Sequence, residues 1–164
     1  MDLQPFYPQH LVPTAMKRWF TNYLIMSRDP LVGGVVGNFG DSAHLAWFKT
    51  FLYLEFIFQT PIFVIAMYAL YYNKRTYYPL LAIYGAQSAT TTLACLVHLV
   101  QTPESTPAII KAGLAGITND QRMLLLGGYT PFFLGALVVA IDFGWRSAKL
   151  IHKAVQIEEE GKWK

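Results

Sequence analysis

Residues 51–72 read FLYLEFIFQTPIFVIAMYALYY, an apolar run interrupted by one acid, Glu55, and one proline, Pro61. Crossing the hydrocarbon core of a bilayer takes about 20 largely apolar residues, so the run is long enough to cross. A segment in lipid must satisfy its own backbone hydrogen bonds, as an α-helix does. The run therefore predicts a membrane-spanning helix.

Two further runs, residues 77–102 and 123–141, contain no Asp, Glu, Lys or Arg. Four tyrosines bracket the first connection and Trp145 follows the last run, as aromatic residues do at membrane interfaces. We therefore predict an all-α helical membrane bundle with three transmembrane helices. The alternative is a soluble all-α protein, which the lack of polar helix faces disfavours.

Composition supports one membrane domain. The 164 residues are 54% hydrophobic and only 14% charged, with a net charge of +3 that is too scattered to indicate nucleic-acid binding. A single cysteine, Cys95, excludes an intrachain disulfide and a cysteine metal cluster. The four histidines form no close ligand pair and common catalytic motifs are missing, so we expect no metal and no cofactor.

The chain divides into three expected parts. Residues 1–50 are a luminal segment whose stretch 13–26 is amphipathic and aromatic and lies along the membrane interface. Residues 51–145 form the transmembrane bundle, and residues 146–164 are a cytosolic tail, helical at first. The basic residues nearest the membrane lie in the 73–76 loop and the tail, which places both on the cytosolic side.

Glu55 is the sharpest functional candidate, because an ionisable residue inside a span marks a functional site by default. Phe48, Leu52, Glu55, Gln59 and Ile62 recur three and four residues apart, which places them on one helix face. A polar pair on that face points into the bundle or a cavity. The alternatives are a structural hydrogen bond between helices and a carboxylate that reaches the interface.

Other positions in the spans predict irregularity or close packing. Pro61 removes a backbone donor and predicts a kink. The hydroxyl-rich run of residues 87–92 favours helix packing over ligand contact. Gly127, Gly128 and Pro131 predict an irregular third helix that lines a cavity, with Tyr129 beside the break.

Three acids outside this pattern have simpler interpretations. Asp142 and Arg146, one turn apart, predict an interfacial ion pair. Asp29 precedes Pro30, which predicts a turn or a helix cap. Spacing alone selects neither Asp29 nor Asp2 as a site.

Five strings of the chain resemble one known family. AWFKTFLYLEFIFQTPIFVIAMYAL (46–70), IYGAQSATT (83–91) and YTPFFL (129–134) are similar to its second, third and fourth helices. MDLQ (1–4) resembles the end of its first helix, and RDPL (28–31) its luminal KDPL. The chain thus resembles the sigma-2 receptor (transmembrane protein 97) family of the EXPERA domain, a group shared with the emopamil-binding sterol isomerase.

The resemblance implies a four-helix bundle with both termini cytosolic, of which this chain supplies the second to fourth helices. The first helix is then missing, through a late start codon, or the chain is a natural three-span form. Three features depart from the family: the glycine-rich insertion at residues 33–40, Phe132 in place of a tyrosine, and Gly161 within a lysine-based retrieval signal.

The resemblance also implies a ligand site inside the membrane. Asp2 contacts a cationic amine and Asp29 supports it, because two close carboxylates in a dry site share a proton and favour one cation. The other implied positions are polar groups from two helices and an aromatic lining, which suits a cation. They are Phe48, Phe51, Glu55, Gln59, Thr91, Tyr129 and Phe132.

The implied function is non-enzymatic binding of sterols or cationic amphiphiles in the endoplasmic reticulum membrane, with endolysosomal and nuclear membranes as further locations. The implied partners are membrane lipids, the Niemann–Pick type C1 transporter in cholesterol homeostasis, and a second copy in a homodimer. The alternative is a Δ8–Δ7 sterol isomerase, whose acid and base Glu55 and Asp29 would supply. A third is a structural helix bundle without a small-molecule site.

Overall fold

The structure is a computed structural model that describes residues 12–39 and 43–162. Its regular elements in these ranges are all helical, of α, 3₁₀ or, at η3, π type. They are, in order, α1 (Thr14–Ser27), α2 (Pro30–Val35), η2 (Ala43–Leu45), α3 (Ala46–Leu54), η3 (Glu55–Gln59), α4 (Thr60–Tyr71), η4 (Arg75–Tyr77), α5 (Tyr78–Gln101), α6 (Pro107–Lys111) and α7 (Asn119–Lys162).

Three helical stretches are long and apolar enough to cross a membrane: Ala43–Tyr71, Arg75–Gln101 and Asn119–Gly161. Each overlaps one of the three predicted spans, although the first begins earlier and the third ends later than predicted, so the predicted all-α membrane bundle is confirmed. The chain is a multi-pass membrane protein. On which side of the membrane each end lies stays a prediction.

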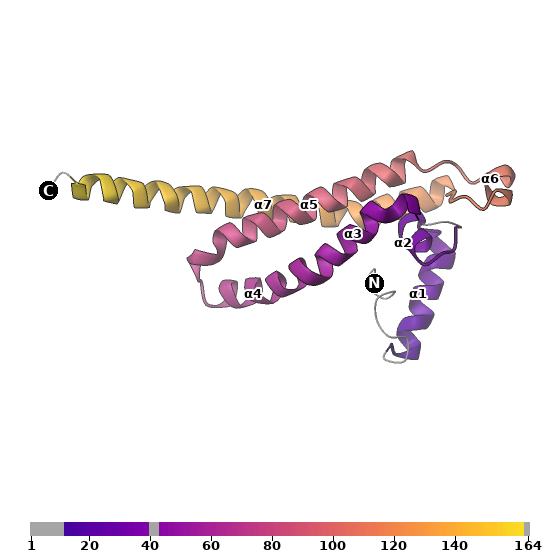
Figure 1. The fold of residues 1–164 in the computed structure, drawn as a ribbon, viewed down its shortest axis with the longest axis horizontal. Helices are drawn as coiled ribbons and strands as arrows, with labels where there is room; N and C mark the ends of the chain where they lie inside the picture. The colour runs from indigo at the N-terminus through magenta and orange to yellow at the C-terminus, as the bar shows by residue number, and fades with distance from the viewer. Residues whose placement is uncertain (1–11, 40–42, 163–164) are drawn as a thin grey trace.

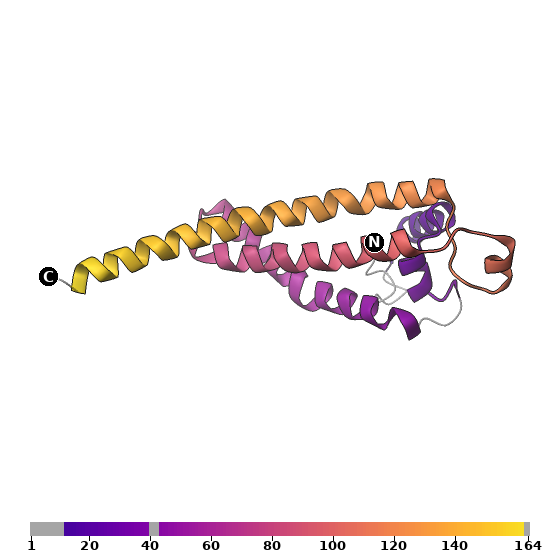
Figure 2. The same cartoon turned by 90° about the horizontal axis from the view of Figure 1, so that it is seen from above.

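The long helices run roughly along one direction (Figures 1 and 2). α5 and α7 lie side by side, and α7 continues beyond the end of α5 toward the C-terminus (Figure 1). A tight turn reverses the chain between α4 and α5, where the Lys74 N–H donates to the Ala69 carbonyl at 2.8 Å. This turn is the antiparallel hairpin that its short, polar sequence predicts.

The contact between α5 and α7 is close because small residues face each other. A Cβ built on Gly85 would lie 2.5 Å from the backbone nitrogen of Ala140 and 2.8 Å from the carbonyl oxygen of Ala136. Only a glycine fits against backbone atoms that cannot move aside. We call this contact the Gly85 seam.

α7 corrects one prediction. The break expected at Gly127, Gly128 and Pro131 is absent, because α7 is one uninterrupted α-helix with Pro131 inside it, although Gly128 and Tyr129 do line a pocket as expected. A proline removes a single backbone hydrogen bond, and the many remaining turns of the helix keep it continuous.

The irregularity lies in the first span instead, one turn before Pro61. η3 is a π-turn in which the Thr60 N–H donates to the Glu55 carbonyl, and the Thr60 hydroxyl donates to the same oxygen at 3.0 Å. Such π-turns are rare in proteins, and many of those that occur lie at functional sites.

α1 lies across the three long helices rather than along them, at the end of the bundle opposite the C-terminus (Figure 1). Its residues are nearly those of the amphipathic stretch 13–26, which was expected to form an interfacial helix. Buried apolar side chains, Leu31 and Val32 of α2 with Leu45, Phe48 and Leu52, fix α2 to the start of the first span.

Candidate functional site

A pocket of about 600 Å³ lies between α1, the first span, α5 and α7. Most of its lining is apolar or aromatic, with a few polar groups. The lining residues are Tyr23, Met26, Phe48, Phe51, Leu52, Glu55, Gln59, Ser88, Thr91, Thr92, Cys95, Leu124, Leu125, Gly128, Tyr129 and Phe132.

The first span contributes the acid and the amide. Glu55 and Gln59 are the two ends of the π-turn η3; Gln59 is 9% exposed and Glu55 is half-buried. Leu52 and Phe48, one and two turns before Glu55, are buried on the same face. The predicted polar face of this span therefore points into the bundle and not into lipid.

α5 contributes hydroxyl groups. The Thr91 and Thr92 hydroxyls donate to the Ser88 carbonyl, at 3.1 and 2.8 Å, so their hydrogens are used within the helix. Their oxygens retain lone pairs that can accept a hydrogen bond from a guest. The hydroxyl run, interpreted from sequence mainly as packing, thus lines the pocket at Ser88, Thr91 and Thr92.

Asp29 is fully buried behind the pocket. One carboxylate oxygen, Oδ1, accepts the N–H groups of Leu31 at 2.9 Å and Val32 at 3.3 Å, which caps α2. This confirms the predicted cap. The other oxygen, Oδ2, accepts the hydroxyls of Tyr23 at 2.7 Å and Tyr129 at 3.0 Å.

The four donors around Asp29 stabilise a buried carboxylate, which would otherwise be costly. The two tyrosines lie between Asp29 and the pocket, since Tyr23 and Tyr129 line the pocket and Asp29 does not. Asp29 orients the two tyrosines, whose oxygens can then accept a donor from a guest.

Seven of the nine residues that the family resemblance implied line this pocket: Phe48, Phe51, Glu55, Gln59, Thr91, Tyr129 and Phe132. Phe132 lies at the rim, with 76% of its surface exposed. Asp29 lies behind the pocket, and Asp2 lies outside the described residues. Whether these residues bind a ligand stays a prediction.

Sequence reasoning missed Tyr23, which joins α1 to the site through Asp29. Its only signal was an aromatic side chain on an amphipathic segment, which an interfacial helix explains as well. Among the described residues, no group of three His, Cys, Asp or Glu side chains is placed to hold a metal ion.

Comparison with known proteins gives the family. The chain is 28% identical to "Sigma intracellular receptor 2" of Homo sapiens over 141 residues, which is 86% of this chain and 75% of that protein. It is 29% identical to the Xenopus tropicalis protein of that name over 137 residues, covering 82% and 71%. The family model described as EXPERA (EXPanded EBP superfamily) matches residues 15–143. Because that match covers most of the chain, the chain belongs to the EXPERA family.

Proposed function

We propose that this membrane protein binds sterols or cationic amphiphiles in the pocket between its spans. The observation that carries the proposal is the lining itself: one acid, one amide and a few hydroxyls in an otherwise apolar wall. Ligand pockets have this composition and volumes of roughly 300–1,000 Å³. The pocket's volume of about 600 Å³ falls inside that range.

The charge of the lining favours an amine or a hydroxyl group as the polar part of the guest. Glu55 is the acid among the described lining residues, and no Lys or Arg lines the pocket with it. A carboxylate away from bulk water is stabilised by a cation or by hydrogen-bond donors. The aromatic rings of Phe48, Phe51 and Tyr129 add favourable surfaces for a cation.

The wider role belongs to the same proposal and rests on the family resemblance. The protein would act without catalysis in the endoplasmic reticulum, in cholesterol homeostasis, with the Niemann–Pick type C1 transporter as partner and a homodimer as assembly. The name of the two relatives, "Sigma intracellular receptor 2", describes receptors and supports ligand binding over catalysis.

A binding assay on the purified full chain in nanodiscs tests the proposal with a labelled sterol and a labelled hydrophobic tertiary amine. Truncating one partner of a buried charge pair costs about 2–5 kcal/mol, so Glu55→Gln should weaken amine binding at least about tenfold. Sterol binding, which needs no charge, should change less than about threefold.

The matched control is Glu104→Gln, which changes an exposed acid outside the pocket. Amine affinity equal in the Glu55→Gln and Glu104→Gln variants would remove Glu55 from the site. A wild-type chain that takes up neither probe would refute the proposal as a whole.

The second candidate is a sterol Δ8–Δ7 isomerase. The observation that favours it is the Tyr129 hydroxyl bonded to the buried Asp29 carboxylate, in the same pocket as Glu55. Isomerisation needs an acid that protonates the alkene and a base that removes a proton elsewhere. Conversion of a Δ8 sterol by the reconstituted chain, and its loss in Glu55→Gln, would establish this activity instead.

A further inference from the structure

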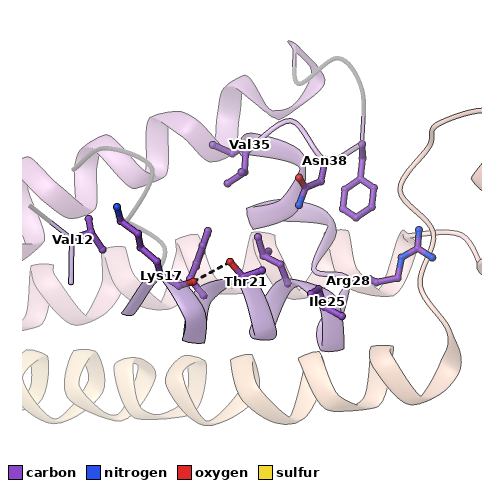
Figure 3. Close-up of a pocket in the computed structure, with 11 residues that line it drawn as sticks. Val12, Lys17, Thr21, Ile25, Arg28, Val35 and Asn38 are labelled. Carbon is purple, nitrogen blue, oxygen red and sulfur yellow. Dashed lines mark hydrogen bonds between the residues drawn. The ribbon is translucent and has the colours of Figure 1, made fainter. Parts of the chain in front are cut away.

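A second cavity, of about 770 Å³, lies under α1, on the side away from the pocket described above. Residues of α1, α2 and the segment that follows α2 line it (Figure 3). It shares no described lining residue with the first pocket. The described lining residues are Val12, Lys17, Phe20, Thr21, Leu24, Ile25, Arg28, Val35, Val36, Asn38 and Phe39.

One face of α1 forms the main wall of this cavity. Lys17, Thr21 and Leu24 follow one another at spacings of four and three residues, which brings them onto one side of the helix, and Arg28, the residue that caps the C-terminus of α1, also lines the cavity. Figure 3 shows Lys17 and Arg28 at the two ends of this wall, with apolar side chains and the Thr21 hydroxyl between them. The Thr21 hydroxyl donates to the Lys17 carbonyl at 3.0 Å.

The charge of this cavity is the opposite of that between the spans. Two cations and no acid line it among the described residues, whereas Glu55 lines the first pocket without a cation. Neither Lys17 nor Arg28 forms an ion pair with a described carboxylate. The guanidinium carbon of Arg28 lies 5.8 Å from the centre of the Phe39 ring, which holds the cation at the cavity.

The orientation of α1 places the cavity at the membrane surface. α1 runs across the long helices at one end of the bundle (Figures 1 and 2). Because those helices cross the bilayer, a helix that runs across them near their ends lies in the interfacial plane. Exposed Met16 and Trp19, which line neither cavity, give α1 the apolar surface that such a helix inserts into lipid.

We propose that this cavity holds an acidic glycerophospholipid. Its acyl chain would lie along Phe20, Leu24 and Val35, and its phosphate would bind Lys17 or Arg28 by a charge-assisted hydrogen bond. An apolar floor with cations at its ends, open at a bilayer surface, matches a molecule that carries a negative headgroup on a hydrocarbon chain. The proposal does not depend on what the pocket between the spans binds.

Lipid retention by the full chain tests the proposal. The chain is purified from vesicles of phosphatidylcholine with one fifth phosphatidic acid, and the lipids that remain bound are counted by mass spectrometry. We expect enrichment of phosphatidic acid over its share in the vesicle. The double variant Lys17→Gln/Arg28→Gln should reduce that enrichment at least about fivefold, and the two single variants identify the cation that holds the phosphate.

Lys111→Gln is the matched control, because it removes an exposed cation of α6 outside the cavity. If the control and the double variant lost phosphatidic acid enrichment equally, the retention would be a non-specific attraction of cations for anionic lipid, and the proposal would be overturned. Lys17→Arg/Arg28→Lys, which keeps the charges, should retain the enrichment even if the neutral variants fold poorly.

A steric variant separates a lipid from a free anion. Val36→Trp adds a large side chain to a half-exposed position of the lining and should exclude the acyl chain, so enrichment should fall with both cations still present. Displacement of the retained lipid by 10 mM inorganic phosphate alone would show a simple anion site and would overturn the assignment to a lipid.

Discussion

The sides of α7 that face α5 and the first span differ in how closely the helices approach. Along α5 the backbones touch through small residues at the Gly85 seam, whereas toward the first span large and polar side chains keep the helices apart around a pocket. Lipid offers little hydrophobic drive for helices to associate, so close packing must come from small residues and hydrogen bonds. The comparison teaches that one side of this bundle gives rigidity and the other leaves room for a guest.

A larger residue in place of Gly85 should have the largest effect on stability. Gly85→Leu forces a side chain into the Ala136 and Ala140 backbone, and we expect a loss of roughly 3 kcal/mol or more, seen as a lower melting temperature in detergent. Gly127→Leu is the control, since an added Cβ there meets no described atom within 4 Å apart from its chain neighbours and the adjacent backbone of its own helix. Equal losses in the two variants would show that the seam is not special.

Removing the buried carboxylate should come next. Asp29→Ala removes the cap of α2 and the acceptor of Tyr23 and Tyr129, which should cost about 2–3 kcal/mol. Asp29→Asn keeps a side-chain oxygen for the cap and should lose less. Chemical denaturation in detergent checks this order; an Asn variant as unstable as the Ala variant would contradict it.

A single tyrosine hydroxyl should matter less. Tyr129→Phe removes one of the two side-chain donors to Asp29, and we expect a loss of about 1 kcal/mol with the fold retained. Tyr71→Phe, at a position 80% exposed, is the control and should leave the melting temperature unchanged. A Tyr129→Phe variant as stable as wild type would mean that Tyr23 alone satisfies the carboxylate.

The smallest effect is expected beyond both regions, on the exposed part of α7. The predicted ion pair is present, with Arg146 Nε 2.8 Å from Asp142 Oδ2, but both side chains are about half exposed. Water and salt screen such pairs. Arg146→Gln should therefore leave the melting temperature unchanged at low and at physiological salt, and a clear drop would show that the pair is coupled to the bundle.

Much of the fold follows from local patterns in the sequence. The three apolar runs predicted the three spans, because a bilayer imposes length and helicity on each segment separately. The spacing of Phe48, Leu52, Glu55 and Gln59 predicted the inward face of the first span for the same reason. Asp29 before Pro30 predicted a cap, which depends only on adjacent residues.

Other features depend on residues far apart in the chain. Pro131 predicted a broken helix, but α7 is continuous, while the irregular turn lies beside Pro61. The bond between Asp29 and Tyr129 joins residues 100 positions apart, and no local pattern indicates it.

The length and periodicity of single segments were enough to predict three membrane-crossing helices and the polar face of the first one, because both properties are local. They did not give the helix bounds, since the first helical stretch begins at Ala43 and α7 continues to Lys162. Only the tertiary structure decided which helices touch and which stand apart, since that depends on whether a Gly or a bulky side chain meets the neighbouring backbone. The same packing gave Asp29 its two tyrosine partners and set the cationic cavity under α1 apart from the acidic pocket between the spans.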